Sequence, residues 1–410
     1  MKRVFAVALG VLTAIGGFVD IGDLVTNAVV GSRFGMSLAW VVVVGVVGIC
    51  LFANMSGRVA AVSGRATFEI IRERLGPRAG LANLGASFFI NLMTMTAEIG
   101  GIALVLQLVT GVEPLLWMPF AAFAVWIVVW RAKFSQLENA AGLLGLSLIV
   151  FAVAVVMLGP DWGALTQQAV LPSVPASEHA ASYWYYAVAL FGAAMTPYEV
   201  FFFSSGAIEE GWKRRDLGQA RLNVLVGFPL GGLLSLAIAA SAAIVLLPQA
   251  IEVTSLSQVA LPVMQAGGTI ALCFLVVGML AAFFGAALET TLSSGYTIAQ
   301  YFGWSWGKFR RPAKAARFHL VMIVGLVIAL AVLLTGVDPV AVTEYSVVFS
   351  AIALPLTYIP ILIISNDPDY MGGDVNTPAV NALALVYLVI IVVAAVAAIP
   401  LMIVSGAGAR

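Results

Sequence analysis

Six carboxylates lie within otherwise apolar segments of this 410-residue chain, and those segments contain no lysine or arginine beside them. The six are Asp20, Asp23, Glu98, Glu199, Glu289 and Glu344. An ionisable group at the centre of a bilayer costs about 2.5–3.5 kcal/mol, so it usually faces a cavity, a partner or a pathway. Because the same segments supply no cationic side chain, we expect the counter-charge to be a cation that arrives from outside.

Asp20 and Asp23 have the spacing that two metal ligands need. On a helix, residues three apart share a face, where two carboxylates repel each other unless a dication lies between them. Gly16, Gly17 and Gly22 bracket the pair and weaken the helix there. We therefore predict Asp20 and Asp23 as metal ligands. The alternative is a hydrogen-bonded cap at a helix break.

A second helix break is predicted at Pro197, which removes a backbone donor and clashes with the preceding turn. Interrupted helices at corresponding places in two halves of a chain indicate a transporter site at the bilayer midplane. Unwound backbone there supplies carbonyl ligands. The Thr196 hydroxyl is a candidate ligand or water-holder, unless it bonds to its own helix. Glu199 is predicted to contact the ion or one of its waters.

Glu98 and Glu289 are predicted as pathway or relay residues. The alternative for each is a protonated acid that is paired with a polar group of a neighbouring helix. Glu344 lies only a few residues into its apolar segment, which favours a position at the membrane interface. The two histidines and two cysteines form no cluster, so we interpret them as structural and predict no catalytic residue.

The composition is that of an all-α polytopic membrane protein, with 62% hydrophobic and 10% charged residues. The start resembles a signal peptide, but the apolar pattern continues past Asp20, so we expect a retained first helix. The apolar runs predict eleven transmembrane helices. They lie near 4–30, 36–62, 80–110, 114–130, 136–158, 182–206, 218–247, 268–302, 318–336, 340–365 and 380–404.

The basic residues predict the orientation in the membrane. Of the 20 lysines and arginines, only Arg33 and Arg410 fall on the side opposite the N-terminus, which predicts an N-terminus inside a multi-pass plasma (inner) membrane protein. The basic, aromatic stretch 303–319 is interpreted as an anchor at the membrane surface. Short loops leave no room for a soluble catalytic domain. We expect no enzyme activity, no cofactor and no nucleic-acid partner; the partners are the bilayer and a divalent metal ion, and the oligomeric state is undetermined.

Five segments, in order, resemble helices of the Nramp divalent-metal transporters. They are GFVDIGDLVTNAVVGSRFG, MTMTAEIGGIALVL, GAAMTPYEVFFFSSG, LETTLSSGYTIAQYFG and YSVVFSAIALPLTYIPILIISND, which resemble the first, third, sixth, eighth and tenth helices. The resemblance implies a leucine-transporter-like fold in a single domain over 1–410. Two inverted five-helix repeats, about 4–158 and 182–365, would be followed by one further helix at about 380–404.

The departures from the family pattern concern the metal ligands. Asp20 matches the metal-binding Asp of the first helix, while Asp23 replaces the metal-binding Asn and Ile21 the adjacent Pro. In the sixth helix, Thr196 stands where the family has its coordinating Met, and Glu199 where it has Asn.

Other departures concern the third, sixth and tenth helices. Glu98 matches a family Glu, but Met95 replaces the Asp one turn earlier and Tyr198 replaces a His. Ala353 stands where a metal-contacting Gln is expected.

The resemblance further implies backbone carbonyl ligands at Gly17 and Ala193. Sulfur is lost and carboxylates are gained, and such a site suits hard cations. The chain therefore most resembles the Nramp-related magnesium transporters, which predicts import of Mg²⁺, and of Mn²⁺ second, by alternating access. Met195 is one residue from Thr196, so a sulfur contact stays open.

Proton coupling is predicted to be weak or absent, because Met95 and Tyr198 occupy the family's proton-route positions. Two alternatives are a proton-coupled Mn²⁺/Fe²⁺ transporter of the Nramp type and a cation-coupled amino acid carrier on the same fold.

Overall fold

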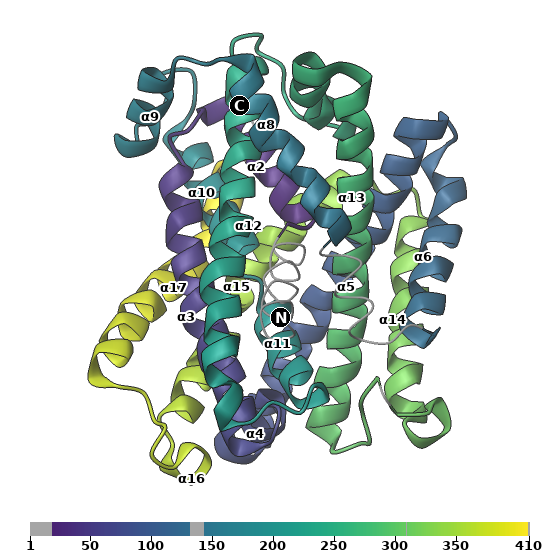
Figure 1. The fold of residues 1–410 in the computed structure, drawn as a ribbon, viewed down its shortest axis with the longest axis vertical. Coiled ribbons are helices and arrows are strands. Elements are labelled where there is room, and N and C mark those ends of the chain that lie inside the picture. Colours follow the sequence, from purple (N-terminus) through teal and green to yellow (C-terminus); the bar gives the residue numbers. More distant parts are fainter. Residues whose placement is uncertain (1–18, 132–142, 309, 409–410) are drawn as a thin grey trace.

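The computed structural model describes residues 19–131, 143–308 and 310–408, and every regular element within them is a helix. Figure 1 shows these helices as one bundle, with α17 at one side and α6 and α14 at the other. The helices are α2 (Ile21–Phe34), α3 (Ala39–Ser63), α4 (Thr67–Leu75), α5 (Pro77–Thr110), α6 (Pro114–Arg131), η1 (Leu146–Ile149), α8 (Val150–Leu158), α9 (Trp162–Val170), α10 (Ala180–Ala194), α11 (Pro197–Glu209), η2 (Arg214–Asp216), α12 (Leu217–Val245), α13 (Leu256–Phe302), η3 (Pro312–Lys314), α14 (Ala316–Leu333), α15 (Pro339–Ser365), α16 (Pro368–Met371) and α17 (Pro378–Val404).

The apolar helices agree with a multi-pass membrane protein. Within the described ranges, nine helical stretches are long and apolar enough to cross a bilayer, when α10 and α11 are taken together. A shorter apolar stretch, Leu143–Leu158, corresponds to the second part of the predicted span 136–158. Much of the predicted span 4–30 lies outside the described residues. The count of eleven, the side of the N-terminus and the bounds of the two repeats therefore stay predictions.

The predicted break at Pro197 is present, and a helix begins at the predicted first break, whose preceding segment lies outside the described residues. Asp20 is extended (φ −99°, ψ −177°) and caps α2, which begins at Ile21. The predicted span 182–206 consists of two helices, since Met195 and Thr196 are not helical and separate α10 from α11. Pro197 is the first residue of α11, a position where its missing N–H breaks no intrahelical bond.

Two segments differ from their predicted bounds. The span expected at 268–302 belongs to a longer helix, α13, which begins at Leu256 and bends at Gly268 (φ 62°). Ser255 and Gln258 form a capping box at the start of this helix, before the predicted first residue. The predicted bounds did not take this capping box into account. The connection near 159–181 contains the short helix α9.

The central position of α2 brings its cap, Asp20, into the core. It packs against α5, α10, α12 and α15, and all 14 of its residues are buried. The contact with α12 is especially close, since a Cβ added at Gly31 would lie 2.1 Å from the Ala239 carbonyl oxygen. Only glycine allows the two helix backbones to approach to this distance.

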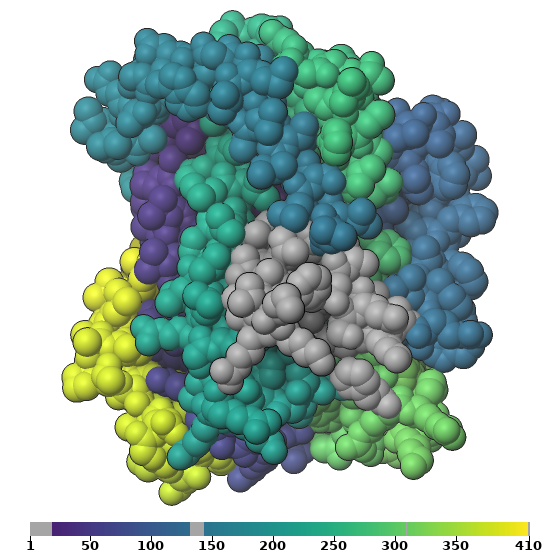
Figure 2. Space-filling model, viewed as in Figure 1, coloured from purple at the N-terminus to yellow at the C-terminus, as the bar shows by residue number. Residues whose placement is uncertain are grey.

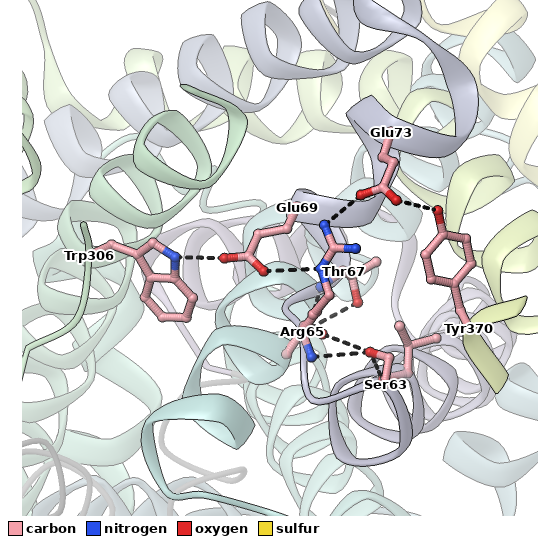
Figure 3. A network of polar contacts seen from close by, with 9 residues as sticks. Ser63, Arg65, Thr67, Glu69, Glu73, Trp306 and Tyr370 are labelled. Atoms are coloured by element: carbon pink, nitrogen blue, oxygen red, sulfur yellow. Dashed lines mark hydrogen bonds and ion pairs between the residues drawn. The ribbon is translucent and has the colours of Figure 1, made fainter. Parts of the chain in front are cut away.

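Polar contacts join three parts of the chain at the end that carries α4 and α16 (Figure 3). Arg65 forms an ion pair with Glu73 at 2.7 Å, and Tyr370 donates a hydrogen bond to Glu73 at 3.2 Å. Trp306 donates to Glu69 at 2.8 Å. Arg65 lowers the pKa of the Glu73 carboxyl, so the pair is ionised at neutral pH. These contacts tie α4 to the loop before α14 and to α16.

The α2–α12 contact makes a stability prediction. Replacing Gly31 by alanine should destabilise the protein by about 1–3 kcal/mol, because backbone atoms must move to make room. The control is Gly85→Ala in α5, where an added Cβ meets no atom within 4 Å. That change should be neutral or stabilise the protein by up to about 1 kcal/mol through helix propensity. Thermal unfolding in detergent measures both; equal effects would contradict the packing argument.

Candidate metal site

Asp20 connects the start of α2 with the break between α10 and α11. Its Oδ1 accepts a hydrogen bond from the Asp23 backbone N–H at 2.7 Å. Its Oδ2 accepts a second hydrogen bond at 3.1 Å from the hydroxyl of Tyr198, the residue that follows Pro197. The side chain of Asp20 is buried rather than directed into lipid. The start of α2 and the break before α11 therefore meet through one carboxylate.

A small cavity lies beside Asp20, between α2, α5, α15 and the residues before α11. The cavity volume, measured as the space that the centre of a water molecule can occupy, is about 10 Å³. This is close to the minimum that one water requires. Most of the lining side chains carry oxygen, and no sulfur atom is among them. The oxygen-bearing lining residues are Asp20, Thr94, Glu98, Thr196, Thr343, Ser346 and Ser350.

Glu98 gives the cavity a second carboxylate. Its Oε1 accepts a hydrogen bond from the backbone N–H of Ile21 at 3.1 Å, in the first turn of α2. Its Oε2 is buried and has no hydrogen-bond partner among the described residues. A buried acceptor without a partner is costly unless water, a proton or a cation satisfies it. This oxygen is therefore suited to a ligand in the cavity.

Asp23 lies next to this cavity but does not line it. Its Oδ2 accepts a hydrogen bond from Ser235 of α12 at 2.5 Å, and its Oδ1 accepts one from Asn27 at 2.9 Å. The structure thus brings Asp23 close to Asp20 through the backbone, while the two carboxylates face different partners. The predicted dication between the two carboxylates stays a prediction.

The remaining predicted residues lie around the cavity at different distances from it. Thr196 lines the cavity and donates a hydrogen bond to Glu199 at 3.1 Å. Glu199 therefore contacts a lining residue but does not line the cavity itself. Ala193 is buried in the last turn of α10 and is not among the lining residues. Gly17 lies outside the described residues. Glu344 is partly exposed in α15, and its position at the membrane interface stays a prediction.

Four carboxyl groups from four helices interact electrostatically in this region. Glu98 and Glu199 each interact electrostatically with Asp20 and Glu289. The buried guanidinium nearest in sequence, Arg33, is paired with Glu178 at 2.6 Å instead. Charges of one sign in a low-dielectric interior repel strongly, so the cluster favours a bound cation or protons.

The side chains of the two neighbouring methionines, Met95 and Met195, do not line the cavity. The Met195 thioether lies against Gly48 of α3 and Tyr387 of α17, within 3 Å of the point where a Cβ on Gly48 would be. The Met95 methyl group contacts Gly325 of α14. Both methionines are fully buried packing residues in this structure.

The hydroxyl-bearing wall of the cavity was not predicted from the sequence. Thr94 and Ser346 place their hydroxyl oxygens 3.0 Å apart, and Thr343 and Ser350 complete this wall. A usable signal was present, because Thr94 precedes Glu98 by four residues and Thr343, Ser346 and Ser350 share one helix face. Ala353, the position where the family pattern has a polar ligand, is one turn further and does not line the cavity.

A stripe of buried polar residues continues from the cavity along α5. Its members recur every three or four residues on one face of the helix and lead toward the end that carries α4. Asn91 donates a hydrogen bond to Ser293 of α13 at 3.3 Å, and its Oδ1 has no partner among the described residues. The stripe consists of Asn83, Ser87, Asn91, Thr94 and Glu98.

Within the part of the chain that the structure describes, no three Asp, Glu, His or Cys side chains form a ready-made metal cluster. The donors that surround the cavity are instead a few carboxylates combined with hydroxyl groups. Such a set is suited to an ion that keeps part of its hydration shell and leaves again.

Comparisons with known proteins agree with this geometry. Residues 10–400 match the family described as "Natural resistance-associated macrophage protein-like", or Nramp. The "Divalent metal cation transporter MntH" of Deinococcus radiodurans is 27% identical over 390 residues, covering 92% of this chain and 85% of its own. The protein of the same name from Pectobacterium carotovorum is 26% identical over 388 residues, covering 92% and 89%.

Solved structures show the same fold. A mutant of the Eremococcus coleocola manganese transporter superposes with a TM-score of 0.77 at 18% identity, covering 98% of this chain and 88% of its own. A nucleobase-cation-symport-1 family transporter superposes with a TM-score of 0.63 at 16% identity, covering 96% and 91%. The leucine-transporter-like fold expected from the sequence is confirmed, and the chain belongs to the Nramp family.

Proposed function

We propose that this protein imports Mg²⁺, and Mn²⁺ as a second ion, across the plasma membrane. Transport proceeds by alternating access with weak or no proton coupling. Family membership and the relatives named as divalent metal cation transporters support a transporter rather than an enzyme. The ion is the substrate and not a resident cofactor. The finer choice of Mg²⁺ rests on the chemistry of the cavity.

The observation that carries this proposal is a cavity lined by oxygen donors with the neighbouring thioether directed away. Carboxylate and hydroxyl oxygens suit hard cations, whereas thioether sulfur selects softer transition metals. Asp20 and Glu98 supply negative charge, and Thr196 supplies a neutral oxygen where the family pattern has methionine. Loss of the sulfur ligand removes the feature that would favour soft ions over Mg²⁺.

The hydroxyl wall has a role in this proposal. Mg²⁺ dehydrates reluctantly and commonly keeps several waters in protein sites. Hydroxyls of α5 and α15, such as those of Thr94 and Ser346, are suited to hold such waters because each can donate and accept hydrogen bonds. The cavity is too small for a hydrated ion in the present state, so binding requires the helices around it to separate.

An entry route is available on the same two helices. A larger polar cavity lies further along α5 and α15, at the end opposite α4, and its lining includes Gln107, Ser255 and Asp338. Gln107 is nine residues beyond Glu98 on α5, which corresponds to about 13 Å along a helix. The polar stripe of α5 offers a route onward to the other end. A membrane potential of 100 mV contributes about 4.6 kcal/mol to inward movement of a dication.

Weak proton coupling is consistent with the side chains at the two replaced positions. Met95 packs against α14 and carries no proton to exchange. Tyr198 donates its hydroxyl to Asp20, and a phenol does not titrate near neutral pH. Glu98 and Glu289 are the remaining candidates for a proton relay.

The second candidate is proton-coupled Mn²⁺ transport, and the manganese transporter among the structural neighbours is the observation that favours it. An amino acid carrier is disfavoured, since several carboxyl groups around the cavity would repel a substrate carboxylate.

Thr196→Met should shift ion selectivity. Restoring a thioether at this position should raise Cd²⁺ uptake relative to Mg²⁺ by about tenfold, because each 1.4 kcal/mol of differential affinity is a factor of ten. Thr196→Ser, which keeps the hydroxyl, is the matched control and should preserve the wild-type ratio. The measurement is Mg²⁺, Mn²⁺ and Cd²⁺ uptake in proteoliposomes. An unchanged Cd²⁺/Mg²⁺ ratio in the methionine variant would show that residue 196 does not select the ion.

Removing the charge at residue 20 should abolish transport. Asp20→Asn keeps the shape and part of the hydrogen bonding but loses a negative ligand, so Mg²⁺ uptake should fall by at least about tenfold. Asp161→Asn, at the exposed cap of α9, changes the same charge far from the cavity and should leave uptake unaltered. Robust Mg²⁺ transport by a folded Asp20→Asn protein contradicts the proposed site.

Proton coupling is tested separately with a pH gradient across proteoliposomes that contain equal Mg²⁺ on both sides. We expect an inward proton gradient to produce less than about a twofold accumulation, while an inside-negative potential drives uptake. Concentrative uptake on the pH gradient alone, lost in Glu98→Gln, favours the proton-coupled alternative.

A further inference from the structure

We infer that the groove between α6 and α14 binds one anionic phospholipid, with its acyl chain in an apolar cleft and its phosphate among exposed basic side chains. The inference concerns a site away from the proposed metal cavity and does not depend on which ion is transported.

The apolar half of the site is a cleft of about 100 Å³ where α6 packs against α14. Figure 2 shows α6 and the α14 region together at one edge of the molecule. Trp126 and Trp130, one turn apart on α6, stack with their ring planes 14° apart. The other lining residues are Val129, Pro312, His319, Met322, Ile323 and Leu326.

The cleft opens toward the surface that faces lipid. Trp130 and Ile323 are 43% and 39% exposed although they also line the cleft. The adjacent surface of α14 exposes Leu320 and Val327, at 59% and 60%. His319 and Leu326 are seven residues apart, so the cleft follows α14 for about 10 Å into the bilayer. Acyl chains are the apolar groups present at such a surface.

The polar half of the site is a group of basic residues at the shallow end of the cleft. The cluster directly flanks the lining residues Trp130, Pro312 and His319 in the sequence. All of its members are exposed, and none has an ion pair among the described residues. The members are Arg131, Arg310, Arg311, Lys314 and Arg317.

Some arginines at the same end of the molecule are neutralised by carboxylates, whereas the cluster has no such partner among the described residues. Arg65 and Arg214 have carboxylate partners at 2.7 Å and 3.0 Å. In the cluster, Arg131 lies over the Trp130 ring at 4.5 Å and Arg317 over the Trp304 ring at 5.2 Å, which orients both guanidinium groups without neutralising them.

An uncharged polar atom completes the site. His319 Nε2 is buried within the cleft lining and has no hydrogen-bond partner among the described residues. A phosphate or glycerol oxygen would supply that partner. Basic pockets between transmembrane helices at a cytoplasmic surface recognise anionic headgroups, and the positive-inside rule predicts that this end is cytoplasmic. Charge and shape therefore select a phospholipid of the cytoplasmic leaflet.

The test compares retention of phosphatidylglycerol and phosphatidylcholine by the purified full-length protein, measured by native mass spectrometry after exchange into lipid–detergent micelles. The wild type should retain phosphatidylglycerol preferentially. The triple change Arg310→Gln, Arg311→Gln and Lys314→Gln should reduce that preference by about tenfold or more. These residues are exposed, so folding should be unaffected.

Two further variants make the result decisive. The control Arg78→Gln, Lys213→Gln and Arg221→Gln removes the same charge at the same end, away from the cleft, and should keep the preference. Ile323→Trp fills the cleft with every basic residue intact and should also weaken retention. If the control loses as much as the first triple, the attraction is diffuse charge and the site is overturned. If Ile323→Trp binds like the wild type, the cleft does not hold the chain, and the site is likewise overturned.

Discussion

The Asp20 carboxylate is the group on which the arrangement of the site depends. A helix that starts in a buried place exposes backbone N–H groups that water does not reach, and Asp20 satisfies one of them, that of Asp23. The same carboxylate accepts the Tyr198 hydroxyl from the second break. One side chain thus caps the start of α2, contacts the break between α10 and α11, and supplies negative charge to a cavity.

The surroundings of Asp20 keep that charge available. Glu98 bonds to the first turn of α2 through one oxygen and leaves the other without a partner among the described residues. The buried arginine at the far end of α2, Arg33, is neutralised by Glu178 and by the Gly408 carbonyl. Because the described cations near α2 already have partners, the carboxyl groups around the cavity are left for an incoming ion or for protons.

Much of the fold could be predicted from the sequence because hydrophobic segments of about 20 residues and helix-breaking residues are local signals. Pro197 locates the break between α10 and α11, and the apolar runs locate most helices to within a few residues. Local signals do not reveal which side chains from distant helices meet. Spacing groups Thr94 with Glu98 on one helix face and Thr343, Ser346 and Ser350 on another, but only the structure shows that the two faces meet at one cavity.

The direction in which individual side chains point could also not be predicted from the sequence. Met195 is adjacent to Thr196, yet its sulfur packs against Gly48, since the chain turns between α10 and α11. Asp23 is three residues from Asp20, yet it faces Ser235. Both outcomes depend on tertiary packing that no spacing rule contains.

The most direct test is an experimental structure with Mn²⁺ bound, in which anomalous scattering locates the ion. The account predicts a peak in the cavity between Asp20, Glu98 and Thr196, with oxygen atoms or waters as its only ligands. A peak coordinated by the Met195 sulfur, or one located away from Asp20, would contradict it.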